Sequence, residues 1–376
     1  MKKNNKITIL QVKKFLKEKG LKILSQKDYK KKIKFSGNFK SLYLTGISSL
    51  VIILISFSLP YLVTLKNNFM TISKETTNNS KTNLEKVLSG KSLENEGEDL
   101  DSAEIFEDIF KEDVPTDTVR LSASTIQQLF KDTNYNLKDV RNKKSVKPIN
   151  LSLLPKEIKM IESSKERKEF FIQIILPLIL EENNQLKFNR KKLFSILNKN
   201  HNSASERNWL NKKFRQYGVK NKDLSTLKIR LDEIPISLVI AQAAKETGWG
   251  TSRFALEGNA LFGQWTYSGA GLKPLGVDTE QTHKVMKFKI LKASIKAYQR
   301  NLNTHSSYRK FRQKRAELRD NGEELDSLIL ADYLDKYAET GKEYTKILKQ
   351  IIKQNNLSDF DDVKLLPTNK KLKNLI

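Results

Sequence analysis

Gln242 and Glu246 interrupt the apolar surface of a stretch whose almost wholly apolar run extends from Ile236 to Ala244. They stand four residues apart, so a helix would carry them on one face. A carboxylate at the C-terminal end of a buried helix meets the negative end of the helix dipole and loses water, and both effects favour its protonated form. A protonated acid near neutral pH is the proton donor that cleavage of a glycosidic bond requires. The pattern indicates a general acid at Glu246, although most glutamates at helix ends simply face solvent.

The residues around Glu246 predict a short buried helix with a sharp end. Pro235 suits its first turn, where a missing N–H costs nothing, and Gly248 and Gly250 end it. Trp249 lies between these glycines, and an aromatic pocket raises the pKa of a carboxyl group. We expect Gln242 and Trp249 to contact the substrate beside the acid.

The composition limits which partners and which catalytic groups the chain can use. The 376 residues carry a formal net charge of +26, which attracts polyanions such as nucleic acid, anionic lipid or an acidic cell wall. There is no cysteine, which excludes disulfides, thiolate catalysis and zinc–thiolate sites. The three histidines, His201, His283 and His305, are far apart and form no metal-ligand pattern. No metal and no other cofactor is expected.

The N-terminal part predicts a membrane anchor. Residues 1 to 40 are crowded with lysine, and residues 41 to 65 contain no charge and are long enough to span a bilayer. The basic flank should stay in the cytoplasm. We therefore expect a single-pass signal anchor in the cytoplasmic membrane, with residues 66 to 376 outside, on the periplasmic face if the cell has an outer membrane. This topology argues against nucleic acid as a partner.

The remaining chain divides by composition and periodicity. Residues 66 to 146 are polar and charged, with one weak helix near 125 to 131, and are predicted to form a partly disordered stem. Residues 147 to 356 show mainly helical patterns, including an apolar core helix around 170 to 180 and a helix over 325 to 339. Glycines and alternating residues between 259 and 289 predict a small β lobe. The tail from 357 to 376 is expected to be loose.

The sequence also resembles a known family. AQAAKETGWGTSRFALEGNALFGQW looks like the active-site motif of the Bax-type branch of glycoside hydrolase family 73, which contains the glucosaminidase domains of bacterial peptidoglycan hydrolases. EFFIQIILPLILEEN resembles the upstream helix of those proteins, and IPISLVIAQAA resembles the start of their catalytic helix. FKILKASIKAYQRNLNTHSSYRKFRQKRAEL and YAETGKEYTKILKQII resemble the downstream segments. The likeness covers about residues 147 to 356.

The resemblance implies a mainly α, lysozyme-like domain with a small β lobe across a cleft. It implies hydrolysis of the β-1,4 glycosidic bond in peptidoglycan glycan strands, with Glu246 in the general-acid position of the motif E-[ST]-x-W-G. It also implies a second carboxylate in the β lobe, or a substrate acetamido group in its place. Asp278 and Glu280 are the only acidic residues between Glu257 and Glu317, and Glu280 is our choice. Lys284 stands where close relatives are expected to carry a glutamate.

Further residues are expected to line the cleft. The family places a tyrosine there from a C-terminal segment, and Tyr337 is the first choice as a catalytic residue, with Tyr344 second. Trp265 and Tyr267 could pack against sugar rings, whereas Phe262 is favoured as a core residue. Arg253, Asn259 and Gln264 could form hydrogen bonds with N-acetyl or peptide groups of the substrate.

Two functions remain open from the sequence. The first is a membrane-anchored peptidoglycan hydrolase of the endo-β-N-acetylglucosaminidase type, held at the bilayer by residues 41 to 65. The alternative is a non-catalytic wall-binding or scaffolding protein that keeps the fold, which Lys284 leaves possible. The sequence does not choose between cleavage that leaves N-acetylglucosamine and cleavage that leaves N-acetylmuramic acid at the new reducing end.

Overall fold

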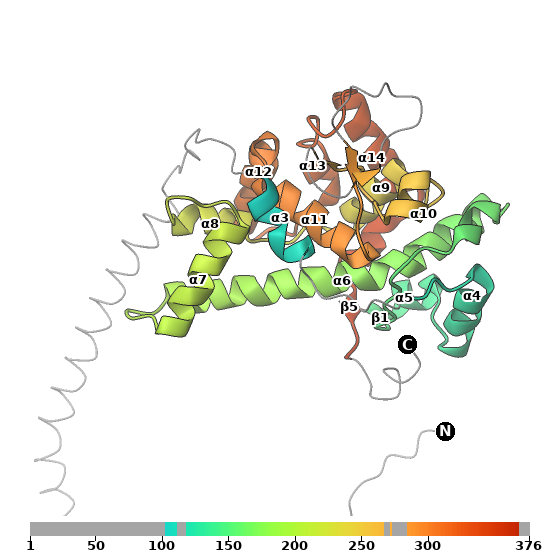
Figure 1. Ribbon diagram of the computed structural model, residues 1–376, viewed down its shortest axis with the longest axis horizontal. Coiled ribbons are helices and arrows are strands. Elements are labelled where there is room, and N and C mark those ends of the chain that lie inside the picture. The colour runs from blue at the N-terminus through green and yellow to red at the C-terminus, as the bar shows by residue number, and fades with distance from the viewer. Residues whose placement is uncertain (1–101, 111–117, 267–270, 273–283, 368–376) are drawn as a thin grey trace, which may run out of the picture. The chain divides into compact units, whose positions relative to one another are not determined.

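A computed structural model describes residues 102–110, 118–266, 271–272 and 284–367 (Figure 1). The chain divides into two compact units, Met1–Asn79 and Ser80–Ile376, and all the described residues belong to the second unit. The predicted basic segment 1–40 and membrane anchor 41–65 lie outside the described residues. Within the described ranges, no helix is both long and apolar enough to cross a membrane.

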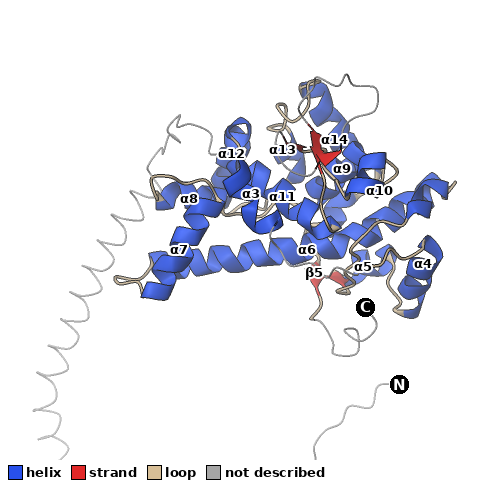
Figure 2. Ribbon diagram, viewed as in Figure 1, coloured by secondary structure: helices blue, strands red, loops and turns tan. Residues whose placement is uncertain are grey.

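The described chain is mainly helical with a few short strands, as predicted (Figure 2). The α-helices are α3 (Ser102–Phe110), α4 (Ala123–Asp132), α5 (Leu137–Lys143), α6 (Ser164–Leu197), α7 (Ala204–Gln216), α8 (Leu224–Arg230), α9 (Ile236–Thr247), α10 (Arg253–Gly258), α11 (Leu291–Thr304), α12 (Arg309–Asp320), α13 (Ser327–Ala331) and α14 (Lys342–Gln354). The 3₁₀ helices are η2 (Lys156–Met160), η3 (Ser306–Tyr308) and η4 (Leu357–Phe360). The strands are β1 (Ser145–Val146), β2 (Trp265–Thr266), β3 (Gly271–Leu272), β4 (Lys284–Met286) and β5 (Lys364–Leu365).

The strands form two small sheets. In the first, which we call the β lobe, β4 lies between β2 and β3 and runs antiparallel to both. Its register pairs Trp265 with Val285 and Gly271 with Met286. In the second sheet, β1 pairs in parallel with β5, with Ser145 opposite Lys364. The predicted small β lobe is therefore present.

Helix α9 lies in the main hydrophobic core, packed against α6, α14 and η4 (Figure 1). Every residue from Ile236 to Ala244 is buried, which confirms that the apolar run forms a helix covered on all sides. Such a helix is held by its neighbours, so its side chains have well-defined positions.

Helix α6 runs along the described domain and carries Pro177 in its interior (Figure 1). Proline has no N–H, so the carbonyl of Gln173, four residues earlier, loses its helical partner. The hydroxyl of Tyr135 donates a hydrogen bond to that carbonyl at 3.1 Å, and Gln173 Nε2 donates to the carbonyl of Tyr135 at 2.9 Å. The connection between α4 and α5 thus packs against α6 at the carbonyl that Pro177 leaves without a helical partner.

The folded body extends beyond both ends of the predicted domain, residues 147–356. The weak helix predicted near 125–131 is present as α4, but α4 and α5 belong to the main core, where Ile126, Phe130 and Val140 are buried. The predicted loose tail is wrong for residues 357–367, because Leu357 and Phe360 of η4 are fully buried and β5 pairs with β1. These segments pack against residues distant in sequence, so local patterns did not reveal them.

The helix predicted over residues 325–339 is much shorter than expected. Only α13 (Ser327–Ala331) is α-helical, and turns follow, with hydrogen bonds such as Tyr337 N to Leu334 O at 3.0 Å. These turns bring Leu334 into the core and Tyr337 against it. Tertiary packing has overridden a helical pattern here.

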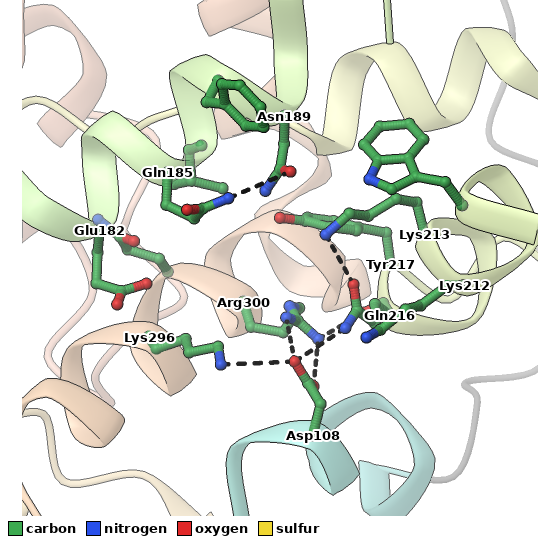
Figure 3. A pocket seen from close by; sticks show the side chains of 14 residues that line it. Asp108, Glu182, Gln185, Asn189, Lys212, Lys213, Gln216, Tyr217, Lys296 and Arg300 are labelled. Carbon is green, nitrogen blue, oxygen red and sulfur yellow. Dashed lines mark hydrogen bonds and ion pairs between the residues drawn. The ribbon is translucent and has the colours of Figure 1, made fainter. Parts of the chain in front are cut away.

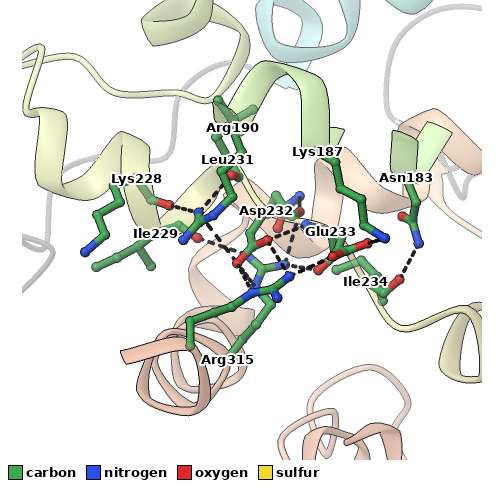
Figure 4. Close-up of polar contacts among 12 residues, drawn as sticks. Asn183, Lys187, Arg190, Lys228, Ile229, Leu231, Asp232, Glu233, Ile234 and Arg315 are labelled. Atoms are coloured by element: carbon green, nitrogen blue, oxygen red, sulfur yellow. Dashed lines mark hydrogen bonds and ion pairs between the residues drawn. The ribbon is translucent and has the colours of Figure 1, made fainter. Parts of the chain in front are cut away.

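A buried ion network fixes the segment that leads into α9 (Figure 4). Asp232 is 2% exposed and forms ion pairs with Arg319 at 3.2 Å and Arg190 at 3.5 Å. Arg315 is fully buried, lies 3.8 Å from the carboxylate of Asp232, and donates to the carbonyls of Ile229 and Glu233. Burial opposes ionisation of Asp232, but the three arginines hold its pKa below the usual value. The chain is thus anchored three residues before Pro235.

Candidate active site

Both ends of α9 are defined by specific contacts. Pro235 precedes its first turn and offers no side-chain cap. Asp361, from the segment after η4, supplies that cap by accepting hydrogen bonds from Ser237 N at 2.8 Å and Ser237 Oγ at 2.6 Å. At the other end, Gly248 adopts the left-handed conformation with φ of 57° and stops the helix two residues after Glu246.

Glu246 is half-buried at the C-terminal end of α9. Its Oε1 accepts a hydrogen bond from the hydroxyl of Tyr344 at 2.9 Å. Its Oε2 lies on the side of Gly263, where a Cβ atom would come within 3.6 Å of that oxygen. One carboxyl oxygen is therefore held by α14, and the other lies beside a residue without a side chain.

Gln242 connects two tyrosines one helical turn before Glu246. It is fully buried, accepts a hydrogen bond from Tyr298 at 2.5 Å, and donates one to the hydroxyl of Tyr344 at 3.1 Å. The prediction that Gln242 and Glu246 share a face of the helix is confirmed, since both contact Tyr344. The structure places Gln242 inside a hydrogen-bonded network rather than at an open surface.

Four tyrosines surround this face, and we call them the tyrosine cluster: Tyr298, Tyr308, Tyr337 and Tyr344. Tyr337 stacks on Tyr344 with centroids 5.4 Å apart, and Tyr308 lies 5.9 Å from Tyr337. Phe262, buried as predicted, stacks on Tyr298 at 3.9 Å. The hydroxyl of Tyr337 donates to the carbonyl of Phe262 at 2.9 Å, which ties the segment before the β lobe to the cluster.

The electrostatics of this site favour a protonated Glu246. Burial raises the pKa of Glu246, and the hydrogen bond from Tyr344 and the charge of Lys245 offset only part of that rise. Burial, with a contribution from the charge of Glu246, also raises the pKa of Tyr308 to about 12 and that of Tyr344 still further. These tyrosines are neutral at physiological pH, so the cluster offers hydroxyl groups and no competing anion.

The turn after α9 has an unusual backbone. Gly248, Trp249 and Gly250 all have positive φ, at 57°, 61° and 84°, and such a value is rare for a bulky residue such as tryptophan. A Cβ atom on Gly250 would come within 2.8 Å of the ring of Phe171, so only glycine fits there. The ring of Trp249 meets Phe171 edge to face at 6.1 Å, and Lys168 lies over it at 5.1 Å. Trp249 therefore packs on α6.

Of the other predicted substrate contacts, Asn259 and Gln264 are buried and Arg253 lies on α10. Asn259 is buried and donates hydrogen bonds to the carbonyls of Phe288 and Lys289. Gln264 is buried and donates to the carbonyl of Ala297 at 3.2 Å. Both amides thus fasten the β lobe to neighbouring backbone. Arg253 lies on α10, where it pairs with Glu257 at 3.3 Å and covers the ring of Phe254.

Several predicted residues fall outside what the structure describes. Glu280 and Tyr267 belong to the ranges 273–283 and 267–270, which are not described, and only the backbone of Trp265 is described, as part of β2. Their assignments stay predictions. Among the described side chains, no group of histidine, cysteine, aspartate or glutamate residues could hold a metal ion.

Sequence reasoning missed Tyr298, Tyr308 and Asp361. Tyr298 and Tyr308 lie within one of the quoted downstream segments but carry no local signal, since an aromatic at helical spacing usually indicates core. Asp361 lies in the predicted loose tail. Sequence reasoning also ranked Tyr337 above Tyr344, yet the structure joins Tyr344 to Glu246.

Comparison with known proteins identifies the family of this chain. Residues 224–357, which include α9, the β lobe and α14, match the family Glucosaminidase, described as mannosyl-glycoprotein endo-beta-N-acetylglucosaminidase. A relative is Protein bax of Escherichia coli (strain K12), which is 32% identical over 210 residues that cover 54% of this chain and 75% of that protein. No solved structure matches the chain. The chain belongs to the glucosaminidase family of glycoside hydrolases, and its substrate class is a glycan.

Proposed function

We propose that this protein is a membrane-anchored peptidoglycan hydrolase that cleaves β-1,4 glycosidic bonds of the glycan strand with Glu246 as its general acid. The observation that carries the proposal is the environment of Glu246. A half-buried carboxyl with a raised pKa is held by Tyr344 on one oxygen and lies beside Gly263 on the other. It belongs to a segment that matches a glycosidase family.

The hydrogen bond from Tyr344 supports one place for the acidic proton. Oε1 accepts from Tyr344, so the proton would reside on Oε2. Oε2 lies beside Gly263, which has no side chain, and the sugar ring would approach from this side. Proton transfer from Oε2 to the glycosidic oxygen lets the leaving group depart as a neutral hydroxyl, which is the task of the acid in this reaction. Tyr344 then stabilises the carboxylate that forms.

The second half of the reaction is proposed from the β lobe, in a lysozyme-like arrangement with a cleft between α9 and that lobe. Glu280 would be the second carboxylate, unless the acetamido group of the substrate takes its part. Trp265 and Tyr267 would pack against sugar rings. The bond cleaved would be that of an endo-β-N-acetylglucosaminidase.

The cellular location follows from the sequence of the first 65 residues. Residues 41–65 would anchor the chain in the cytoplasmic membrane, with the lysine-rich residues 1–40 inside and the hydrolase outside, where the glycan is. The excess of basic residues would favour contact with an anionic wall.

The test is cleavage of purified peptidoglycan by the full chain, in detergent, measured as new reducing ends. We expect the wild type to release fragments and Glu246→Gln to be slower by about 10²- to 10⁴-fold, the usual contribution of a general acid. Glu324→Gln is the matched control, because Glu324 is exposed, belongs to no predicted site and should leave the rate unchanged. Equal rates for wild type and Glu246→Gln would refute the role of Glu246.

The same experiment separates the remaining alternatives. A chain that binds peptidoglycan without releasing reducing ends would be the non-catalytic wall-binding protein that Lys284 leaves open. If the chain cuts, N-acetylglucosamine at the new reducing end identifies a glucosaminidase, and N-acetylmuramic acid identifies a muramidase.

A further inference from the structure

A cavity of about 380 Å³ lies between α3, α6, α7 and α11 (Figure 3). This volume is within the range of small-ligand sites. Asp108 comes from α3, Gln185 and Asn189 come from α6, Lys213 comes from α7, and Arg300 comes from α11. None of these side chains contributes to the site around Glu246.

Helix α11 separates the cavity from the tyrosine cluster. Tyr298 points to Gln242, with which it shares a hydrogen bond of 2.5 Å. Lys296 and Arg300 each stand two residues from Tyr298, which is about 200° around a helix, so they lie on the opposite face and line the cavity. The two sites therefore share a wall but no side chain.

The charge of the cavity is mainly positive. Its cationic side chains are Lys212, Lys213, Lys296 and Arg300, and its carboxylates are Asp108 and Glu182. Asp108 is already engaged, since it pairs with Arg300 at 3.1 Å and Lys296 at 3.6 Å and accepts a hydrogen bond from Gln216 at 2.9 Å (Figure 3). The carboxylate of Asp108 therefore connects α3 to α7 and α11.

Lys213 forms no ion pair with a carboxylate among the described residues, and Asp108, the anion that acts on it from a distance, is already paired with Arg300 and Lys296. Its ammonium donates to the neutral amide oxygen of Gln216 at 3.0 Å and lies 5.6 Å from the ring centre of Trp209. Burial, together with the nearby charge of Arg300, lowers the pKa of Lys213 to about 8. A partly buried cation with no carboxylate in ion-pair contact is costly, and a bound anion would reduce that cost.

Aromatic and amide groups surround this cation. Trp209 is partly exposed, and Phe188 is 62% exposed although it is a large apolar residue. Gln185 and Asn189 face the cavity beside them (Figure 3). Aromatic faces pack against the apolar faces of sugar rings, and amides form hydrogen bonds with hydroxyl and acetamido groups.

We propose that this cavity is a second binding site, separate from the site of Glu246, for an anionic glycan whose sugar ring packs on Trp209 and Phe188 and whose carboxylate or phosphate pairs with Lys213. The choice of a wall glycan as its source rests on the proposed function. The carboxylates could belong to the peptidoglycan strand itself, and the phosphates to a polymer attached to it. Such a site would hold the wall while Glu246 acts on a strand.

The test is a binding measurement that does not depend on cleavage. The full chain with Glu246→Gln is titrated by calorimetry with soluble peptidoglycan fragments, with the same fragments after their carboxylates are amidated, with a phosphate-bearing wall polymer, and with inorganic phosphate. We expect one of the two anionic glycans to bind, and adding Lys213→Gln to weaken that binding at least tenfold. Lys191→Gln, which removes an exposed charge on α6 outside the cavity, should leave the affinity unchanged.

The outcomes separate the ligand sources and the two proposals. Loss of binding on amidation identifies the carboxylate source, and binding of the phosphate polymer identifies the other source. Absence of binding by both glycans, binding of inorganic phosphate alone, or equal affinities for Lys213→Gln and Lys191→Gln would overturn the second site. Binding through Lys213 by a wild-type chain that cuts nothing would refute the hydrolase and leave this site standing.

A chemical measurement covers the case in which Lys213→Gln fails to fold. With a pKa near 8, Lys213 should react with an acylating reagent at pH 8, and mass spectrometry of the chain carrying only Glu246→Gln reports the modified lysines. A saturating glycan should protect Lys213 at least fivefold and leave Lys191 unprotected. Equal labelling of Lys213 with and without the glycan would contradict the proposal.

Discussion

At the scale of single residues, two opposing effects act on Glu246. Burial favours its neutral form, whereas the hydroxyl of Tyr344 donates to Oε1 and favours the carboxylate. Burial is the larger effect, so the pKa of Glu246 is raised, and the hydrogen bond limits how far it rises. Tyr344 therefore tunes the pKa of the proposed general acid, which would have to both hold a proton and release it.

Tyr344→Phe tests this balance. Loss of the donated hydrogen bond should raise the pKa of Glu246 further, so the fall of kcat/KM with rising pH should move to higher pH. The free energy of unfolding should also drop by about 1 to 2 kcal/mol, because Gln242 Nε2 loses its acceptor. The measurement is the pH profile of glycan cleavage.

Tyr337→Phe is the matched control for that profile. Its hydroxyl donates to the carbonyl of Phe262 and does not contact Glu246, so the variant should keep the wild-type pH limb. If the high-pH limb of the kcat/KM profile shifts equally in Tyr344→Phe and Tyr337→Phe, or shifts in neither, the role assigned to Tyr344 is contradicted.

At the scale of elements, two aspartates hold the start of α9, and their pKa values shift in opposite directions. Asp361 caps the helix, and burial raises its pKa to about 6 despite the hydrogen bonds from Ser237. Asp232 lies in the segment before the helix, where Arg315, Arg190 and Arg319 outweigh burial and lower its pKa. Acidification should therefore affect their contributions to stability in opposite directions.

Asp361→Asn should change the pH dependence of stability. A carboxyl group whose pKa rises from about 4 in the unfolded chain to about 6 in the folded chain destabilises the fold as pH increases through that window. Between pH 4 and 6.5, the wild type should lose about 1 to 3 kcal/mol relative to Asp361→Asn. Urea unfolding at several pH values measures this, and parallel curves for the two proteins would contradict it.

Asp232→Asn should destabilise the fold at neutral pH. The substitution leaves Arg315 buried without its counter-charge, and breaking a buried pair in this way typically costs about 3 to 5 kcal/mol. The wild-type contribution is present above about pH 4 and is lost as the pH falls through the lowered pKa of Asp232. Glu343→Gln, at an exposed ion pair with Lys346, should cost less than about 1 kcal/mol in the same denaturation experiment.

At the scale of the whole described unit, the segment before residue 147 completes the core. Tyr135 meets the carbonyl that Pro177 leaves without a partner, and Ile126, Phe130 and Val140 are buried in the same core as α9. Helix α3 packs Ile105, Phe106 and Ile109 against residues that include Val285 and Met286 of β4. The polar composition of residues 102–146 conceals several apolar side chains that are buried in the fold, such as Ile109, Ile126 and Phe130.

Truncation at residue 147 should therefore unfold or strongly destabilise the protein. Burial of one large apolar side chain contributes about 1.5 to 3 kcal/mol, so losing four or five of them removes an amount comparable to the whole stability of a domain, about 5 to 15 kcal/mol. A chain that begins at residue 102 keeps these contacts and is the control. Thermal unfolding measures both, and equal melting temperatures would show that α4 and α5 do not support the core.

The sequence by itself determined the parts whose signals are local. The apolar run from Ile236 to Ala244 could only be a buried helix, its two glycines ended it, and the four-residue spacing placed Gln242 and Glu246 on one face. The motif around Glu246 led to the correct family. The small β lobe and most helices followed from periodicity for the same reason.

Only the tertiary structure decided what surrounds that acid. Tyr298, Tyr308, Tyr337 and Tyr344 converge on one face of α9 from segments 50 to 100 residues away, and no spacing rule links residues that distant. The turns after α13 replaced a predicted helix because they place Leu334 in the core and Tyr337 at the carbonyl of Phe262. Local sequence sets helices and their faces, but the pKa of a carboxyl depends on which distant side chains exclude water from it.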